Sequence, residues 1–78
     1  MAPYNPPDAH YSEVTVDSEE KATKLLHSGG KMLYNLTKKL KLKYIWYDNE
    51  RRVLELWGPY YAFASGAEAK LMKKLESL

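Results

Sequence analysis

The sequence contains no cysteine. Disulfides, thiolate nucleophiles and cysteine-ligated zinc sites are therefore excluded together, and this absence is typical of a reducing compartment. No apolar run approaches the roughly 18 residues that cross a bilayer, and the first residues lack a basic stretch followed by an apolar one. We therefore predict an intracellular protein of the cytoplasm or nucleus, with neither a membrane segment nor a signal peptide.

Residues suited to catalysis are also scarce. The two histidines are His10 and His27, and no motif sets a serine beside a histidine and an acid. The glycines of Gly29-Gly30-Lys31 are too few for a nucleotide-binding phosphate loop. A chain of 78 residues forms one small domain with no room for a deep cleft. We predict that the protein is not an enzyme and that it needs no cofactor or metal.

The remaining composition is that of a folded domain. Hydrophobic residues make up 45% and charged residues 28% of the chain, with a net charge of +2. This charge excludes a strongly basic tail but allows a local basic face. Three of the four prolines lie in residues 1–11, which predicts a flexible lead-in, either a linker or a proline-rich ligand. The domain itself is predicted for residues 12–78.

Alternating valines in residues 12–16 predict a strand. Asp17 and Glu20 match a capping box, so a helix is expected to follow through Leu26. Gly29-Gly30 should end that helix. A second helix is predicted by an apolar stripe made of Met32, Leu33, Leu36 and Leu40.

Residues 44–47 and 53–57 favour strands and flank a turn, which predicts an antiparallel hairpin. An amphipathic helix should close the chain, beginning at Ser65 with a second capping box that ends at Glu68. The state of residues 60–64 stays open. The fold class predicted is α+β, with three helices on one face of a three-stranded antiparallel sheet in the order β-α-α-β-β-α.

This order resembles a K-homology (KH) domain of the eukaryotic type over residues 12–78. Family members carry Ile-Gly-x-x-Gly-x-x-Ile-x-x-Ile/Leu between their first two helices, and here Leu26, Gly30, Leu33 and Leu36 fall in register. His27 occupies the place of the first loop glycine, so the loop motif is degenerate. The resemblance implies a module that binds about four nucleotides of single-stranded RNA or DNA.

The resemblance also implies which residues would bind. Gly29, Gly30 and Lys31 would contact phosphate, and His27 and Ser28 would shape the loop. A glycine lets the backbone approach an anion closely, and the following helix directs its amides toward it. Electrostatic attraction would come from Lys38, Lys39 and Lys41. The groove floor, or the core beneath it, would be formed by Leu26, Leu33 and Leu36.

A protein-interaction module that has lost nucleic-acid binding is the alternative. The missing glycine and the low net charge favour it. Aromatic residues are dense between Tyr44 and Tyr61, and one set should face away from the helices, because Leu54 and Leu56 form the better core pair. For Trp46 and Trp57 we rank packing across the sheet first, then a contact with a protein partner or a second copy, then base stacking.

Overall fold

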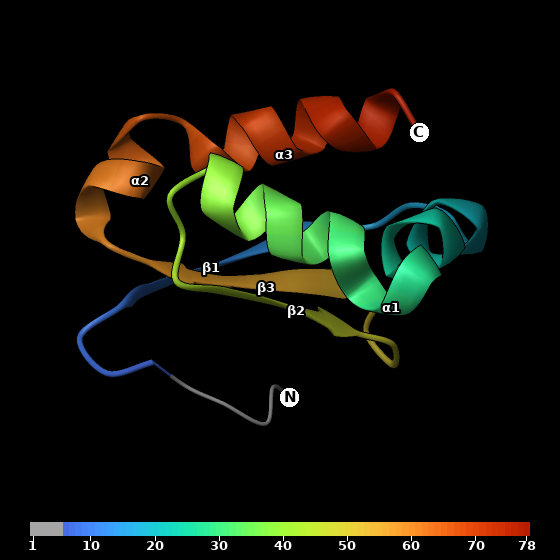
Figure 1. The fold of residues 1–78 in the computed structure, drawn as a ribbon, viewed down its shortest axis with the longest axis horizontal. Coiled ribbons are helices and arrows are strands. Elements are labelled where there is room, and N and C mark those ends of the chain that lie inside the picture. Colours follow the sequence, from blue (N-terminus) through green and yellow to red (C-terminus); the bar gives the residue numbers. More distant parts are fainter. Residues whose placement is uncertain (1–5) are drawn as a thin grey trace.

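The computed structural model describes residues 6–78, apart from the side chain of Ser28. Its elements are β1 (His10–Thr15), α1 (Glu19–Lys39), β2 (Tyr44–Asp48), β3 (Val53–Gly58), α2 (Tyr60–Ala64) and α3 (Ala67–Glu76). The strands form one antiparallel sheet in the order β1-β3-β2. Helices α1 and α3 lie on one side of this sheet (Figure 1). The predicted α+β class and three-stranded antiparallel sheet are therefore confirmed.

The predicted lead-in and the first strand differ from the structure in their bounds. β1 begins at His10, two residues before the predicted strand, because it pairs with the full length of β3, from His10 opposite Gly58 to Thr15 opposite Val53. Pro6 is buried. The part of the lead-in formed by residues 1–5 lies outside the described residues.

Both predicted helix caps were misplaced by one residue. Ser18, not Asp17, caps α1, because its side chain accepts a hydrogen bond from the Lys21 amide at 3.1 Å. Ser65 ends α2 instead of starting α3, and its hydroxyl donates to the Tyr61 carbonyl at 2.8 Å. Gly66, with a φ of 89°, precedes α3. A serine or acid at either of two adjacent positions satisfies the capping pattern, so the sequence pattern does not separate them.

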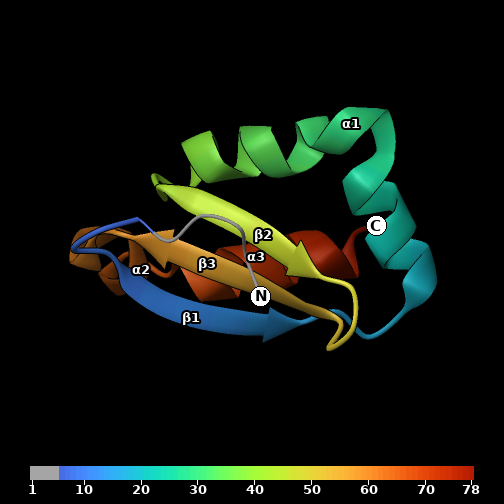
Figure 2. The same cartoon turned by 90° about the horizontal axis from the view of Figure 1, so that it is seen from below.

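α1 continues through the two glycines at which we predicted it to end. Gly29 and Gly30 nevertheless have φ values of 70° and 79°, a conformation that favours glycine. The helix bends sharply there, and its second half then runs alongside β2 (Figure 2). The predicted pair of helices is thus one bent helix, and the bend places residues 31–39 over the sheet.

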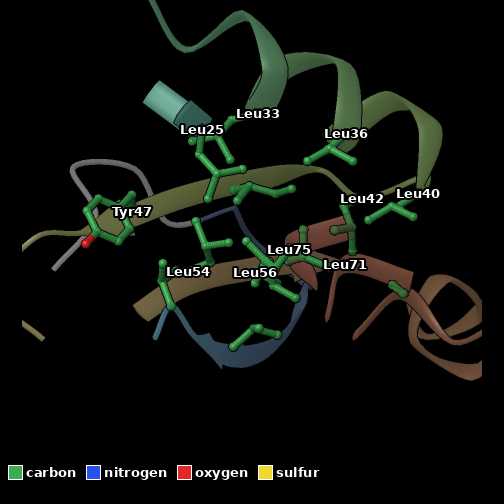
Figure 3. Close-up of a cluster of buried hydrophobic side chains, with 14 of the residues drawn as sticks. Leu25, Leu33, Leu36, Leu40, Leu42, Tyr47, Leu54, Leu56, Leu71 and Leu75 are labelled. Carbon is green, nitrogen blue, oxygen red and sulfur yellow. The ribbon is translucent and has the colours of Figure 1, made fainter. Parts of the chain in front are cut away.

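The core lies between the sheet and the helices (Figure 3). Leu25, Leu54, Leu56 and Leu71 have no exposed surface. Leu54 and Leu56 occupy alternate positions of β3 and so share the face that the helices cover. Ile45 and Tyr47 of β2 belong to the same core cluster, which confirms the predicted core pair of β3.

Gly58 marks the closest approach of backbone segments at the end of β3. A Cβ atom added there would lie 2.7 Å from Leu42 Cδ2 and 3.1 Å from Leu42 Cα. Leu42 is itself buried, so it has little freedom to move away. A side chain at position 58 therefore overpacks this joint.

We predict that Gly58→Ala destabilises the fold by about 1–3 kcal/mol, the usual cost of overpacking. Urea unfolding of the two proteins measures the difference. In a Leu42→Val background, which removes the clashing Cδ atoms, the same glycine substitution should cost less. An equal cost in both backgrounds would contradict this steric explanation.

Candidate functional site

The largest hollow among the described residues is a groove between the bend of α1 and β2. Its volume is about 730 Å³, within the range of ligand-binding pockets. Residues of α1 form one wall, and β2 with its flanking residues forms the other. The lining residues are Leu26, Gly29, Gly30, Leu33, Tyr34, Thr37, Lys43, Tyr44, Ile45, Trp46, Tyr47 and Asn49. We call this hollow the α1–β2 groove.

The α1 wall is a stripe at helical spacing. Leu33, Tyr34 and Thr37 recur at helical spacing in the second half of α1 and so face one side of it. Leu26 of the first half and Gly30 at the bend line the same groove. Leu26 is 44% exposed and Tyr34 is 60% exposed. Lys38 Nζ lies 4.6 Å from the centre of the Tyr34 ring, a cation–π contact. This wall therefore offers an accessible aromatic ring beside a positive charge.

The opposite wall is the edge of the sheet. β2 is an edge strand because only β3 pairs with it, so part of its backbone donors and acceptors are available for pairing outside the sheet. Four consecutive residues of β2, from Tyr44 to Tyr47, line the groove. Side chains on an edge strand alternate between the two faces. The groove therefore follows the strand's edge rather than either face.

The residues predicted from the loop motif divide between two surfaces. Gly29, Gly30, Leu26 and Leu33 line the α1–β2 groove, and Lys38 reaches it through Tyr34. A second hollow, on the side of α1 that faces α3, is lined by His27, Lys31, Leu36 and Lys39, among others. Consecutive residues of a helix point about 100° apart. Within the second half of α1 this step places Lys31, Leu36 and Lys39 on another face than Leu33, Tyr34 and Thr37.

Three further residues that we predicted for the binding site lie outside the α1–β2 groove or beside it: Leu36, Lys41 and Ser28. Leu36 is buried beneath the second hollow and does not line the α1–β2 groove with Leu33. Lys41 lines a small hollow of about 160 Å³ that also contains Tyr61 of α2. Ser28 belongs to the turn of α1 just before the glycines.

Sequence reasoning missed the aromatic and polar lining of the groove. Tyr34 could have been found, because it is next to Leu33 and lies one helical turn before Lys38, two residues that we predicted for the site. Lys43 and Asn49 flank β2 and enter the groove only through the packing of β2 beside α1, so no local pattern indicates them.

The sheet face opposite the helices is filled by its own side chains. Trp57 is only 7% exposed, and its ring centre lies 5.0 Å from that of Tyr11 and 5.6 Å from that of Tyr44. Packing across the sheet, ranked first for Trp57, is thus what the structure shows. The predicted exposure of this face was wrong at its centre, where Trp57 and Glu55 are both buried.

Arg51 accounts for the burial of acids on this face. Its guanidinium donates to Asp48 at 3.0 Å, to Glu13 at 2.7 Å and to Glu55 at 2.6 Å. Hydrogen bonds from Arg51 hold the pKa of Asp48 well below its usual range. Those from Tyr11 and Arg51 lower the pKa of Glu13. One guanidinium thus bridges carboxylates from β1, β2 and β3.

No family model, curated protein or solved structure gives a significant match to this chain. No helix within residues 6–78 combines the length and the apolar character that crossing a membrane requires.

We predict that Arg51→Gln lowers stability most at neutral pH. A carboxylate whose pKa is lowered by folding stabilises the folded protein at pH values above the pKa of the unfolded state. This stabilisation is lost as the pH falls through the pKa of the folded state. The gap between the urea midpoints of wild type and variant should therefore narrow below about pH 4.

Arg52→Gln is the matched control, because the partner of Arg52 is Glu19, whose side chain is 78% exposed. Exposed ion pairs contribute little, so this variant should unfold close to wild type at every pH. A pH-independent loss in Arg51→Gln would contradict the carboxylate explanation.

A substitution at Gly30 tests whether the bend is required. In a straight helix Gly→Ala stabilises by about 0.5–1 kcal/mol, whereas a left-handed conformation costs an L-residue about 1–2 kcal/mol. A Cβ at Gly30 would meet no atom within 4 Å, so steric clash does not confuse the result. We predict that Gly30→Ala destabilises the protein in urea unfolding. Stabilisation would instead indicate that α1 can straighten without cost.

Proposed function

We propose that the protein is a KH-like module that binds a short single strand of RNA or DNA in the α1–β2 groove. The observation that carries this proposal is the groove itself, which is lined by exposed Tyr34 of α1 and by half-buried Trp46 of the edge strand β2. Base–aromatic stacking contributes about 1–3 kcal/mol per base and tolerates any sequence. A groove with two such rings suits unpaired bases.

The dimensions of the groove support a short ligand. The rise along β2 from Tyr44 to Tyr47 is about 10 Å at 3.3 Å per residue. A stacked strand advances about 3.4 Å along its axis per nucleotide, so three to four stacked nucleotides span the same length as these four residues of β2. Backbone groups on the outer edge of β2 can form hydrogen bonds with the edges of bases, because the bases of a single strand are not paired with a second strand.

The positive charges around the groove suit a polyanionic ligand. Lys43 lines it, and Lys38 lies above the Tyr34 ring. The positive φ values at Gly29 and Gly30 leave their Cα atoms in open space, where a phosphate could approach the backbone. The acidic side chains that Arg51 bridges lie on the other face of the sheet, away from the helices.

We predict that Tyr34→Ala weakens binding of a short degenerate RNA about 5- to 150-fold, the equivalent of one lost stacking contact. Because Tyr34 is 60% exposed, its removal should leave the fold unchanged. Fluorescence anisotropy measures the affinity, and a ¹⁵N–¹H spectrum verifies the fold.

Tyr60→Ala is the matched control. Tyr60 is 69% exposed and lies on α2, away from the groove. Equal affinities of the two variants would contradict the groove assignment. Spectral shifts confined to residues outside the groove on RNA addition would do the same and would favour a protein-interaction module.

A further inference from the structure

A second, basic cleft lies between the second half of α1 and α3. It consists of two adjoining hollows of about 400 and 440 Å³, which share Leu36, Lys39 and Lys74. Five lysines line them, two from α1 and three from α3: Lys31, Lys39, Lys70, Lys73 and Lys74. No acidic residue lines either hollow. We call this surface the α1–α3 cleft.

The positive charge of the cleft is not compensated within the protein. The lysine ion pairs of residues 6–78 are Lys21–Asp17 and Lys24–Glu20, both at the start of α1. None of the five cleft lysines forms one. Arg51 and Arg52 are also paired with acids. The cations in ion pairs therefore lie away from the cleft, and five of the lysines outside these pairs line it.

Helix stability explains only part of this cluster. Lys39, Lys73 and Lys74 lie in the last turns of their helices, where cations complement the helix dipole. Lys31 and Lys70 lie outside those turns. Lys70 also stands three and four residues from two other lysines, a spacing at which like charges destabilise a helix. An external anion would remove this repulsion.

The shape of the cleft favours an extended anion over a small one. Lys31 and Lys39 are about 12 Å apart along α1 at a rise of 1.5 Å per residue. A stacked strand advances by three to four nucleotides over that span, at about 3.4 Å along its axis per nucleotide. All five lysines are exposed, so none forms the buried charged contact that would hold a single ion. Their charges act together on a chain of phosphates.

We infer that the α1–α3 cleft binds the phosphate backbone of the same single strand, beyond the nucleotides held in the α1–β2 groove. This inference rests on the proposed function. Lys38 and Lys39 are adjacent at the end of α1, one at the groove and the other at the cleft. A strand leaving the groove around this helix end would thus enter the cleft. The cleft increases the affinity for longer strands and the salt dependence of that affinity, and it contributes no sequence specificity.

The test compares an oligouridine of about 4 nucleotides, which fills the groove alone, with one of about 12, which reaches the cleft. The variant is Lys70→Gln with Lys74→Gln, both exposed helix positions where glutamine preserves helix propensity. For the longer strand, the slope of log K against log salt should become shallower by about 1.4, or 0.7 for each lost phosphate contact. For the shorter strand the slope should not change.

Lys21→Gln with Lys24→Gln is the control of equal charge, because both lysines lie in the first half of α1 and are already paired. It should change the slope for the longer strand less than the cleft variant does. An unchanged slope in the cleft variant overturns the inference, and so does equal binding of the two strands by wild type. Shifts of α3 amides with a glutamate-rich peptide but not with the oligouridines overturn it in favour of an acidic protein partner.

The two proposals fail separately. If Tyr34→Ala binds both strands like wild type while the cleft variant loses salt dependence, the groove assignment fails and the cleft stands. If Tyr34→Ala loses affinity for both strands while the cleft variant does not differ from wild type, the cleft assignment fails and the groove stands.

Discussion

The bend of α1 at Gly29 and Gly30 is the constraint on which the candidate surfaces depend. Two consecutive residues with φ near 70–80° redirect the helix without ending it, so residues 31–39 lie along β2 while the first half of α1 continues past the end of the sheet (Figure 2). Only glycine adopts this conformation without a steric penalty. The two glycines thus position a helix that has a hollow on either side.

Those two hollows differ in chemistry because opposite faces of one helix carry different residues. The face toward β2 carries Leu33, Tyr34 and Thr37, and the face toward α3 carries Lys31 and Lys39. A helical period of 3.6 residues separates neighbours in the sequence onto these faces. In our proposals, residues 31–39 of α1 thus lie between an aromatic groove for bases and a basic cleft for phosphates.

The acids that Arg51 bridges and the lysines of the cleft also lie on different surfaces of the molecule. Arg51 bridges Asp48, Glu13 and Glu55 on the sheet face away from the helices, and two of these acids, Asp48 and Glu55, are buried. Three acids are therefore bridged on one face of the sheet, and five lysines without an ion pair among residues 6–78 line the cleft on the other side. A chain with a net charge of only +2 can still present a strongly basic surface when its acids are paired elsewhere.

Local patterns in the sequence determined the fold class, the hairpin and the core pair Leu54 and Leu56, because strand alternation and glycine conformation act over a few residues. The family resemblance implied a phosphate contact at Gly29, Gly30 and Lys31 and a groove floor of Leu26, Leu33 and Leu36, and four of these six residues line one groove: Leu26, Gly29, Gly30 and Leu33. Only the tertiary structure decided that Lys31 and Leu36 face the other way, that Glu55 and Trp57 are buried, and that α3 brings lysines beside those of α1. The reason is physical: which face of a helix or strand is covered depends on packing against elements distant in the chain, and a local pattern does not contain that information.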